Sequence, residues 1–113
     1  MWLCMNDAFL SVVADRNDEG NLLVRARVKG HIEKVFPKAK TFTSNDSDYM
    51  YRAFIDREDV AIAVYERLME VEYDNFKSSV KNRPLHDAYL KVWHIMYGMQ
   101  PIKKLKSYKL FGG

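Results

Sequence analysis

Two short segments in which side chains alternate between two faces constrain the fold of this chain most strongly. Residues 8–15 (AFLSVVAD) place only apolar side chains on one face of an extended segment, and residues 22–28 (LLVRARV) do so again. A period of two is typical of a strand with one buried face. The intervening RNDEGN is rich in residues that favour turns. The sequence therefore predicts an antiparallel hairpin near the N-terminus.

The segment after this hairpin is expected to hold a short helix and two more strands. Apolar residues within 29–37 recur at helical spacing until Pro37, which cannot continue a helix. Residues 39–44 and 49–56 are expected to be extended. The turn between them is predicted from Ser, Asn and Asp residues, whose side chains can bond to their own backbone.

Two longer helices are expected in the second half of the chain. The first runs from about 57 to 72, where Asp56 is placed to cap the first turn. The second begins near Leu85 and ends at Gly98 and Pro101. Each has an apolar stripe of the kind that faces a core. The stripes are Val60, Val64, Leu68 and Val71, broadened by Ala61, Tyr65 and Met69, and then Leu85, Ala88, Tyr89, Val92, Met96 and Met99.

The resulting order, ββαββαα, predicts the α+β class. We expect a two-layer domain in which an antiparallel sheet of about four strands carries its helices on one face. No repeat, low-complexity tract or linker divides residues 1–100, which we assign to this single domain. Residues 101–113 are predicted to be a basic flexible tail.

Charge is unevenly distributed along the chain. The tail contains Lys103, Lys104, Lys106 and Lys109 and no acidic residue, so removing these four charges from the net +3 leaves residues 1–100 at −1. A basic domain that attracts phosphate over its whole surface is therefore not expected. The four lysines are candidates for partner binding, with nucleic acid possible through the tail or a local patch.

Several functional classes lack their usual sequence signals. A single cysteine, Cys4, excludes an internal disulfide and a zinc site of the multi-cysteine kind. No apolar run approaches the ~20 residues that cross a bilayer, and Asn6 and Asp7 interrupt the apolar N-terminus, unlike a signal peptide. A cytoplasmic location without a membrane span is expected.

The usual motifs for catalysis or cofactor binding are absent from the sequence. The chain contains no Gly-rich phosphate loop, G-x-S-x-G, H-E-x-x-H or C-x-x-C. Residues 15–20 imitate the opening of a calcium loop, but its twelfth position is Ala26, which has no carboxylate. No catalytic residue, metal ligand or cofactor is predicted.

Residues 73–93 (YDNFKSSVKNRPLHDAYLKVW) look most like a reactive site. On a helix, however, Asp87 and His94 lie about 10 Å apart, too far for the carboxylate to orient the imidazole. Pro84 instead favours a joint between two helices, because it disfavours helix before it and suits the first turn after it. A small enzyme that uses His86 or His94 is kept as an alternative.

The sheet face opposite the apolar one is predicted to carry arginine and aromatic side chains. If the helices cover the apolar face, the other displays Arg25, Arg27 and Arg52 beside Phe9 and Phe54. Such groups suit a protein interface, and they also grip phosphate and stack on bases. A solvated face without a partner is the third interpretation. We assign these five residues to partner binding, with a protein partner as the leading hypothesis and nucleic acid as the alternative.

Three blocks of the chain, at 21–37 (NLLVRARVKGHIEKVFP), 73–80 (YDNFKSSV) and 85–93 (LHDAYLKVW), carry a resemblance. They resemble a group of small, uncharacterised bacterial and prophage proteins of about this length. The resemblance implies an accessory protein of a phage or mobile element, a class that includes non-enzymatic inhibitors of host defence such as anti-CRISPR proteins. We therefore expect a small binding protein, and not an enzyme, that acts by occupying a surface on a larger partner.

Overall fold

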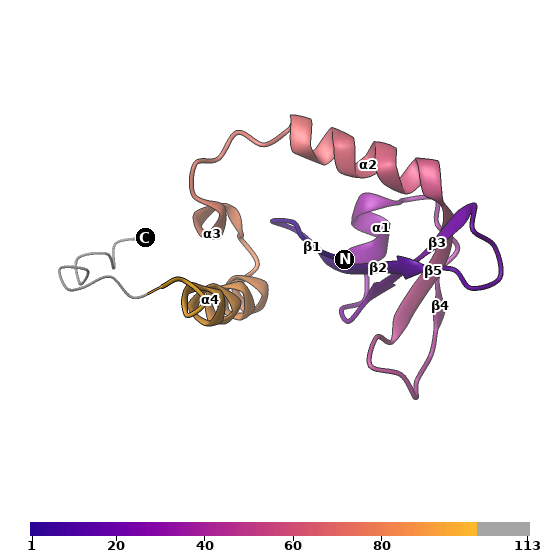
Figure 1. Ribbon diagram of the computed structural model, residues 1–113, viewed down its shortest axis with the longest axis horizontal. Helices are drawn as coiled ribbons and strands as arrows, with labels where there is room; N and C mark the ends of the chain where they lie inside the picture. The colour runs from indigo at the N-terminus through magenta and orange to yellow at the C-terminus, as the bar shows by residue number, and fades with distance from the viewer. Residues whose placement is uncertain (102–113) are drawn as a thin grey trace.

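The computed structural model describes residues 1–101 and has the predicted α+β class. Its five strands form one antiparallel sheet in the order β1-β2-β3-β5-β4 (Figure 1). The elements in chain order are β1 (Trp2–Cys4), β2 (Phe9–Ala14), β3 (Asn21–Ala26), α1 (His31–Val35), β4 (Phe42–Thr43), β5 (Tyr51–Asp56), α2 (Arg57–Met69), α3 (Phe76–Ser79) and α4 (Arg83–Tyr97).

Two of these elements were not predicted. The sheet has five strands where about four were expected, because β1 adds a strand of three residues. The short helix α3 is likewise an addition. Three or four residues are too few for a period to be recognised, and β1 is defined by its pairing with β2, which sequence alone does not reveal.

The predicted hairpin is confirmed as β2 and β3, and its register places apolar residues opposite one another. Val12 lies opposite Val24, and Val24 lies opposite Ala53 on β5. In the connecting loop, the side chains of Asp15 and Asp18 accept hydrogen bonds from the backbone N–H groups two residues later, at 2.9 Å. The segment that imitates a calcium loop is therefore an ordinary turn between strands.

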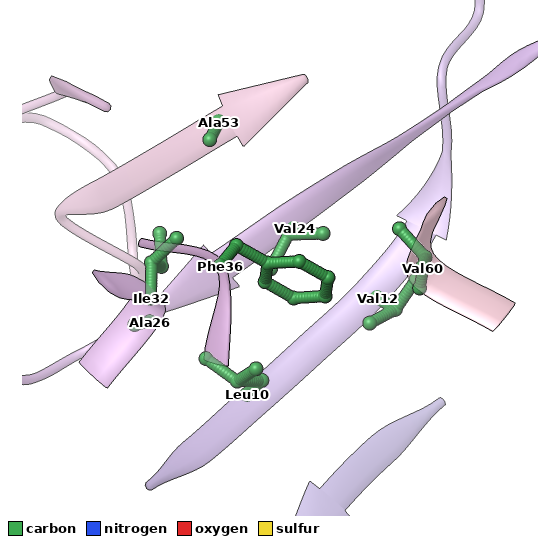
Figure 2. Packing of buried hydrophobic residues seen from close by; sticks show 8 residues of the cluster. All are labelled: Leu10, Val12, Val24, Ala26, Ile32, Phe36, Ala53 and Val60. Carbon is green, nitrogen blue, oxygen red and sulfur yellow. The ribbon is translucent and has the colours of Figure 1, made fainter. Parts of the chain in front are cut away.

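The main core lies between one face of the sheet and the helices α1 and α2. Figure 2 shows its eight buried side chains, which are Leu10, Val12, Val24, Ala26, Ile32, Phe36, Ala53 and Val60. Five of them come from alternate positions of β2, β3 and β5, as the period of two predicts, and the other three come from α1, the residue after it and α2. Full burial of a side chain such as Leu10 or Ile32 contributes about 1.5–3 kcal/mol.

A second, smaller cluster holds α3 and α4 against the sheet at the β1 end (Figure 1). Val80, Leu85 and Tyr89 are buried there and pack with Phe9 and Phe76. The Tyr89 hydroxyl lies 2.9 Å from the carbonyl oxygen of Met5 and 3.0 Å from that of Ala8, so it can donate to either. This contact fixes α4 to the turn between β1 and β2.

The predicted joint in residues 73–93 is confirmed. The helices α3 and α4 are separated by residues 80–82, and Pro84 lies in the first turn of α4. The Asn82 side chain caps that turn by accepting from the backbone N–H of Leu85 at 3.0 Å. Likewise Asp56 caps α2, as predicted, by accepting from the N–H of Glu58 at 2.8 Å.

The prediction that the apolar stripes of the two long helices face a core is wrong for much of their length. In α2 only Val60 is buried, whereas Leu68 and Met69 are 67% and 70% exposed. In α4 the stripe is buried at Leu85 and Tyr89, and Met96 is 60% exposed. Both helices bury apolar side chains in their first half only, and large apolar side chains of their later turns stay exposed within residues 1–101.

Candidate functional site: an arginine face on the sheet

The sheet face opposite the main core brings together the three arginines predicted from the alternation. Arg25 on β3 lies directly opposite Arg52 on β5, and residues opposite each other in an antiparallel pair share a face. Arg27 follows β3 directly. We call Arg25, Arg27, Arg52 and the Tyr49 ring between them the arginine cluster.

Tyr49 organises the cluster. The guanidinium carbon of Arg25 lies 4.4 Å from the centroid of the Tyr49 ring, and that of Arg27 lies 4.2 Å from it. These are cation–π distances. The ring is only 3% exposed, and its hydroxyl oxygen accepts a hydrogen bond from the indole N–H of Trp2 at 3.1 Å. Tyr49 is therefore a fixed platform for two cations.

Each arginine is positioned by one further hydrogen bond. Arg25 Nη2 donates to Ser11 Oγ at 2.7 Å, Arg27 Nε to the Asp48 carbonyl at 3.3 Å, and Arg52 Nε to the Tyr49 carbonyl at 3.0 Å. These three hydrogen bonds anchor the guanidinium groups of the cluster. The buried Nε of Arg25 has no hydrogen-bond partner within the described residues. Leaving such a donor unsatisfied costs about 1–3 kcal/mol.

The cluster carries an excess of positive charge. Within residues 1–101, its arginines form a single ion pair, between Arg52 Nη2 and Asp48 Oδ1 at 3.9 Å. The Asp48 side chain is 69% exposed, so water screens this pair strongly. The cluster thus has three cations and one weakly paired carboxylate. This excess of positive charge favours binding of an anionic group from another molecule.

An exposed aromatic pair borders the cluster. Phe54 lies two residues beyond Arg52 on β5, and Phe42 on β4 lies opposite Arg52, so all three side chains share a face. The two rings stack with centroids 5.7 Å apart. Phe54 was predicted, but Phe42 was missed, because β4 has only two residues and shows no alternation. Its pairing with β5 is the signal that identifies it.

Phe9 and the tail lysines do not join the described site. Phe9 is half-buried, with its ring centroid 5.4 Å from that of Trp2 and 6.4 Å from that of Tyr89. It therefore helps to hold α4 instead of lining an open surface. Lys103, Lys104, Lys106 and Lys109 lie outside the described residues.

The three histidines occupy unlike positions. His31 is buried, and its Nδ1 accepts a hydrogen bond from the Phe9 N–H at 3.0 Å. Burial lowers the pKa of this imidazole. His86 Nδ1 lies 3.2 Å from the neighbouring Asp87 Oδ1, and His94 is exposed on α4 with Trp93 at its edge. Three hollows within residues 1–101 are lined by neither of these two histidines, so these hollows give the enzyme alternative no support.

Two further features are absent from the described residues. No group of three or more His, Cys, Asp or Glu side chains in residues 1–101 is arranged to hold a metal ion. None of the described helices combines the length and apolar character needed to cross a bilayer.

The arginine cluster and its aromatic border form the most distinctive surface of the described chain. Comparison with known proteins adds no family to this description, since no protein-family model, no curated protein and no solved structure matches the chain.

Proposed function

We propose that this chain is a non-enzymatic binding protein that uses the arginine cluster to hold an acidic surface of a protein partner. The observation that carries this proposal is that two guanidinium groups stack on one buried ring and a third bonds to the same residue's carbonyl, with a single exposed carboxylate paired to the cluster. Binding would act by occupying the partner's surface. Inhibition of a host defence complex, which the resemblance to prophage proteins implies, is one form of such binding and stays a prediction.

The anchoring of the arginines supports this proposal. Arg25 and Arg27 are stacked on Tyr49 and hydrogen-bonded, so they lose little conformational freedom when an anion arrives. A guanidinium presents a planar fork of donors that matches the two oxygens of a carboxylate. Arginine and aromatic residues are also enriched where protein interfaces are strongest. The exposed Phe42 and Phe54 supply the aromatic part.

Nucleic acid is the second candidate, and the stacked Phe42–Phe54 pair beside Arg52 favours it. Exposed rings next to guanidinium groups can stack on unpaired bases while the cations hold phosphate. The net charge of −1 over residues 1–100 favours a protein instead, because nucleic-acid-binding domains usually present a basic surface. The two candidates differ in their salt dependence, since phosphate binding releases counterions.

The first prediction is that replacing Arg25, Arg27 and Arg52 together by alanine abolishes partner capture and leaves the protein folded. The cluster lies outside the main core, so folding should survive. Capture is measured by affinity purification from a lysate of the cells that encode the chain, followed by mass spectrometry, with and without nuclease. Circular dichroism checks that the variant is folded.

A matched control removes three exposed positive charges elsewhere, by replacing Arg16, Arg83 and Lys91 with alanine. This variant has the same net charge as the cluster variant and should keep the partner. Equal capture by the cluster variant would contradict the proposal. Capture that disappears after nuclease treatment would replace the protein partner with nucleic acid.

A further inference from the structure

The first strand, β1, is an edge of the sheet and borders a groove of about 540 Å³. This size lies within the range of ordinary binding clefts. One wall is formed by the consecutive residues 2–6, and the other by the second half of α2 and the chain that follows it. We call this hollow the β1 groove. It shares none of its lining residues with the arginine cluster.

The backbone of β1 offers unpaired hydrogen-bonding groups at this edge. Met1 exchanges two hydrogen bonds of 2.8 Å with Val12, and the Met5 N–H donates to the Ala8 carbonyl at 2.9 Å. Because backbone groups of successive residues in a strand point to opposite sides, those of Trp2 and Cys4 point away from β2. Within residues 1–101 these groups have no hydrogen-bond partner.

The side chains of the groove are apolar on its helix side. Leu3 packs against the main core, so a residue placed beside Leu3 on an added strand would point the same way. It would meet Val64, Leu68 and Val71, which line the groove. Leu68 is 67% and Val71 46% exposed in the described chain. An apolar side chain at that position would cover them.

The rim of the groove carries negative charge. Glu70 and Glu72 line it and form no ion pair with any described residue. Arg67 is already paired with Asp7, with an Nη1–Oδ1 distance of 2.7 Å, and its Nη2 also donates to the Lys34 carbonyl at 3.1 Å. The remaining cation of the lining is Lys81. A basic side chain would therefore complement this rim.

We propose that the β1 groove binds an extended segment of a partner protein as an added strand. The segment pairs its backbone with Trp2 and Cys4, directs an apolar side chain toward Leu68, and places basic side chains beside Glu70 and Glu72. An exposed sheet edge commonly recruits peptides in this way. Pairing with β1 of a second copy fits poorly, because residues 2–6 have no basic side chain.

The experiment uses a random library of twelve-residue peptides displayed on phage and panned on the immobilised full chain. We expect enrichment of peptides that alternate apolar and basic residues. A selected peptide is then synthesised, and its Kd is measured by fluorescence polarisation for each variant. The same peptide, N-methylated at its central residues, keeps its side chains but loses the backbone donors. It should bind at least about tenfold more weakly, since each lost hydrogen bond is worth roughly two- to tenfold in affinity.

Variants of the chain test the same pairing from the other side. Cys4→Pro removes an N–H that points to the free edge, where proline is tolerated, and should weaken binding at least about fivefold. Replacing both Glu70 and Glu72 by glutamine should weaken it several-fold, and more at low salt than at high salt. The triple alanine variant of the arginine cluster is the control and should bind unchanged, so this proposal can fail independently of the proposed function.

Three results would overturn the inference. They are the absence of enriched peptides, equal binding of the N-methylated peptide, and loss of binding in the arginine-cluster variant instead of in the glutamine variant. The glutamine variant changes only exposed side chains, so it decides the question if Cys4→Pro does not fold.

Discussion

At the scale of single residues, buried side chains with polar groups have defined interaction partners. Tyr49 receives two cations on its ring, while His31 accepts a backbone hydrogen bond inside the protein. The alternation of β3 and β5 was sufficient to predict that Arg25 and Arg52 share a face. Tyr49 was not predicted as part of the site, because residues 49–56 were expected to be one extended segment, in which alternation would place Tyr49 on the face opposite Arg52, whereas it lies in the loop before β5.

The buried His31 makes stability depend on pH. Burial lowers its pKa in the folded state, and the Nδ1 that accepts from the Phe9 N–H must be unprotonated. Below the unfolded pKa of about 6.5, the unfolded chain therefore binds more protons than the folded one at this residue. The free energy of unfolding should be highest above that pH and fall by up to about 1.4 kcal/mol for each pH unit below it, until the folded pKa is reached.

Urea unfolding at pH 7.5 and 5.5 measures this effect. His31→Asn keeps an acceptor near the Phe9 N–H but cannot titrate, so its stability should change less between the two pH values. The carboxyl of Asp7 does not add to the change in stability between these two pH values. Burial raises its pKa, but the Arg67 guanidinium more than offsets this and holds the pKa below the usual 3.8. Equal pH dependence in the two proteins would show that His31 is not responsible.

At the scale of elements, the sequence predicted which segments are helices and strands better than how they dock. Period two identified β2, β3 and β5, the cap residue Asp56 identified the start of α2, and Pro84 marked the start of α4. The helical stripes predicted an apolar face for α2 but not that this face leaves the core after Val60. How far a helix continues over a sheet depends on tertiary geometry, which a local pattern does not contain.

Tyr89→Phe tests the docking of α4. The ring should stay packed on Phe9 and Phe76, while the hydrogen bond to the carbonyl oxygens of Met5 and Ala8 is lost. Thermal unfolding should show a loss of about 0.5–1.5 kcal/mol. Amide exchange should become faster in α4 while β3 keeps its protection. A uniform loss of protection would mean that the molecule unfolds only as a whole.

At the scale of the whole molecule, apolar surface is unevenly distributed. The later turns of α2 and α4 hold large exposed side chains, including Met69 at 70% and Ile95 at 74% exposure. Surfaces of this kind promote association unless a partner covers them. They were not predicted as exposed, because an amphipathic pattern cannot tell a face covered within the chain from a face left for a partner.

Replacing both Leu68 and Met69 by lysine should therefore raise solubility with little change in stability. Both side chains are exposed, and surface substitutions usually change the free energy of unfolding by less than about 0.5 kcal/mol. Static light scattering over a concentration series measures association, and urea unfolding measures stability. A large loss of stability would show that α2 packs against other residues through this face.

The hydrogen bond between Tyr89 and Met5 also has a consequence in time. Its two residues are 84 positions apart in the chain. At a synthesis rate of about 5–20 residues per second, Met5 waits roughly 4–17 s before Tyr89 exists. The strand β1 is therefore made early, but its contact with α4 can form only after this interval. A nascent chain should therefore be open to proteases and chaperones around β1 until α4 has been made.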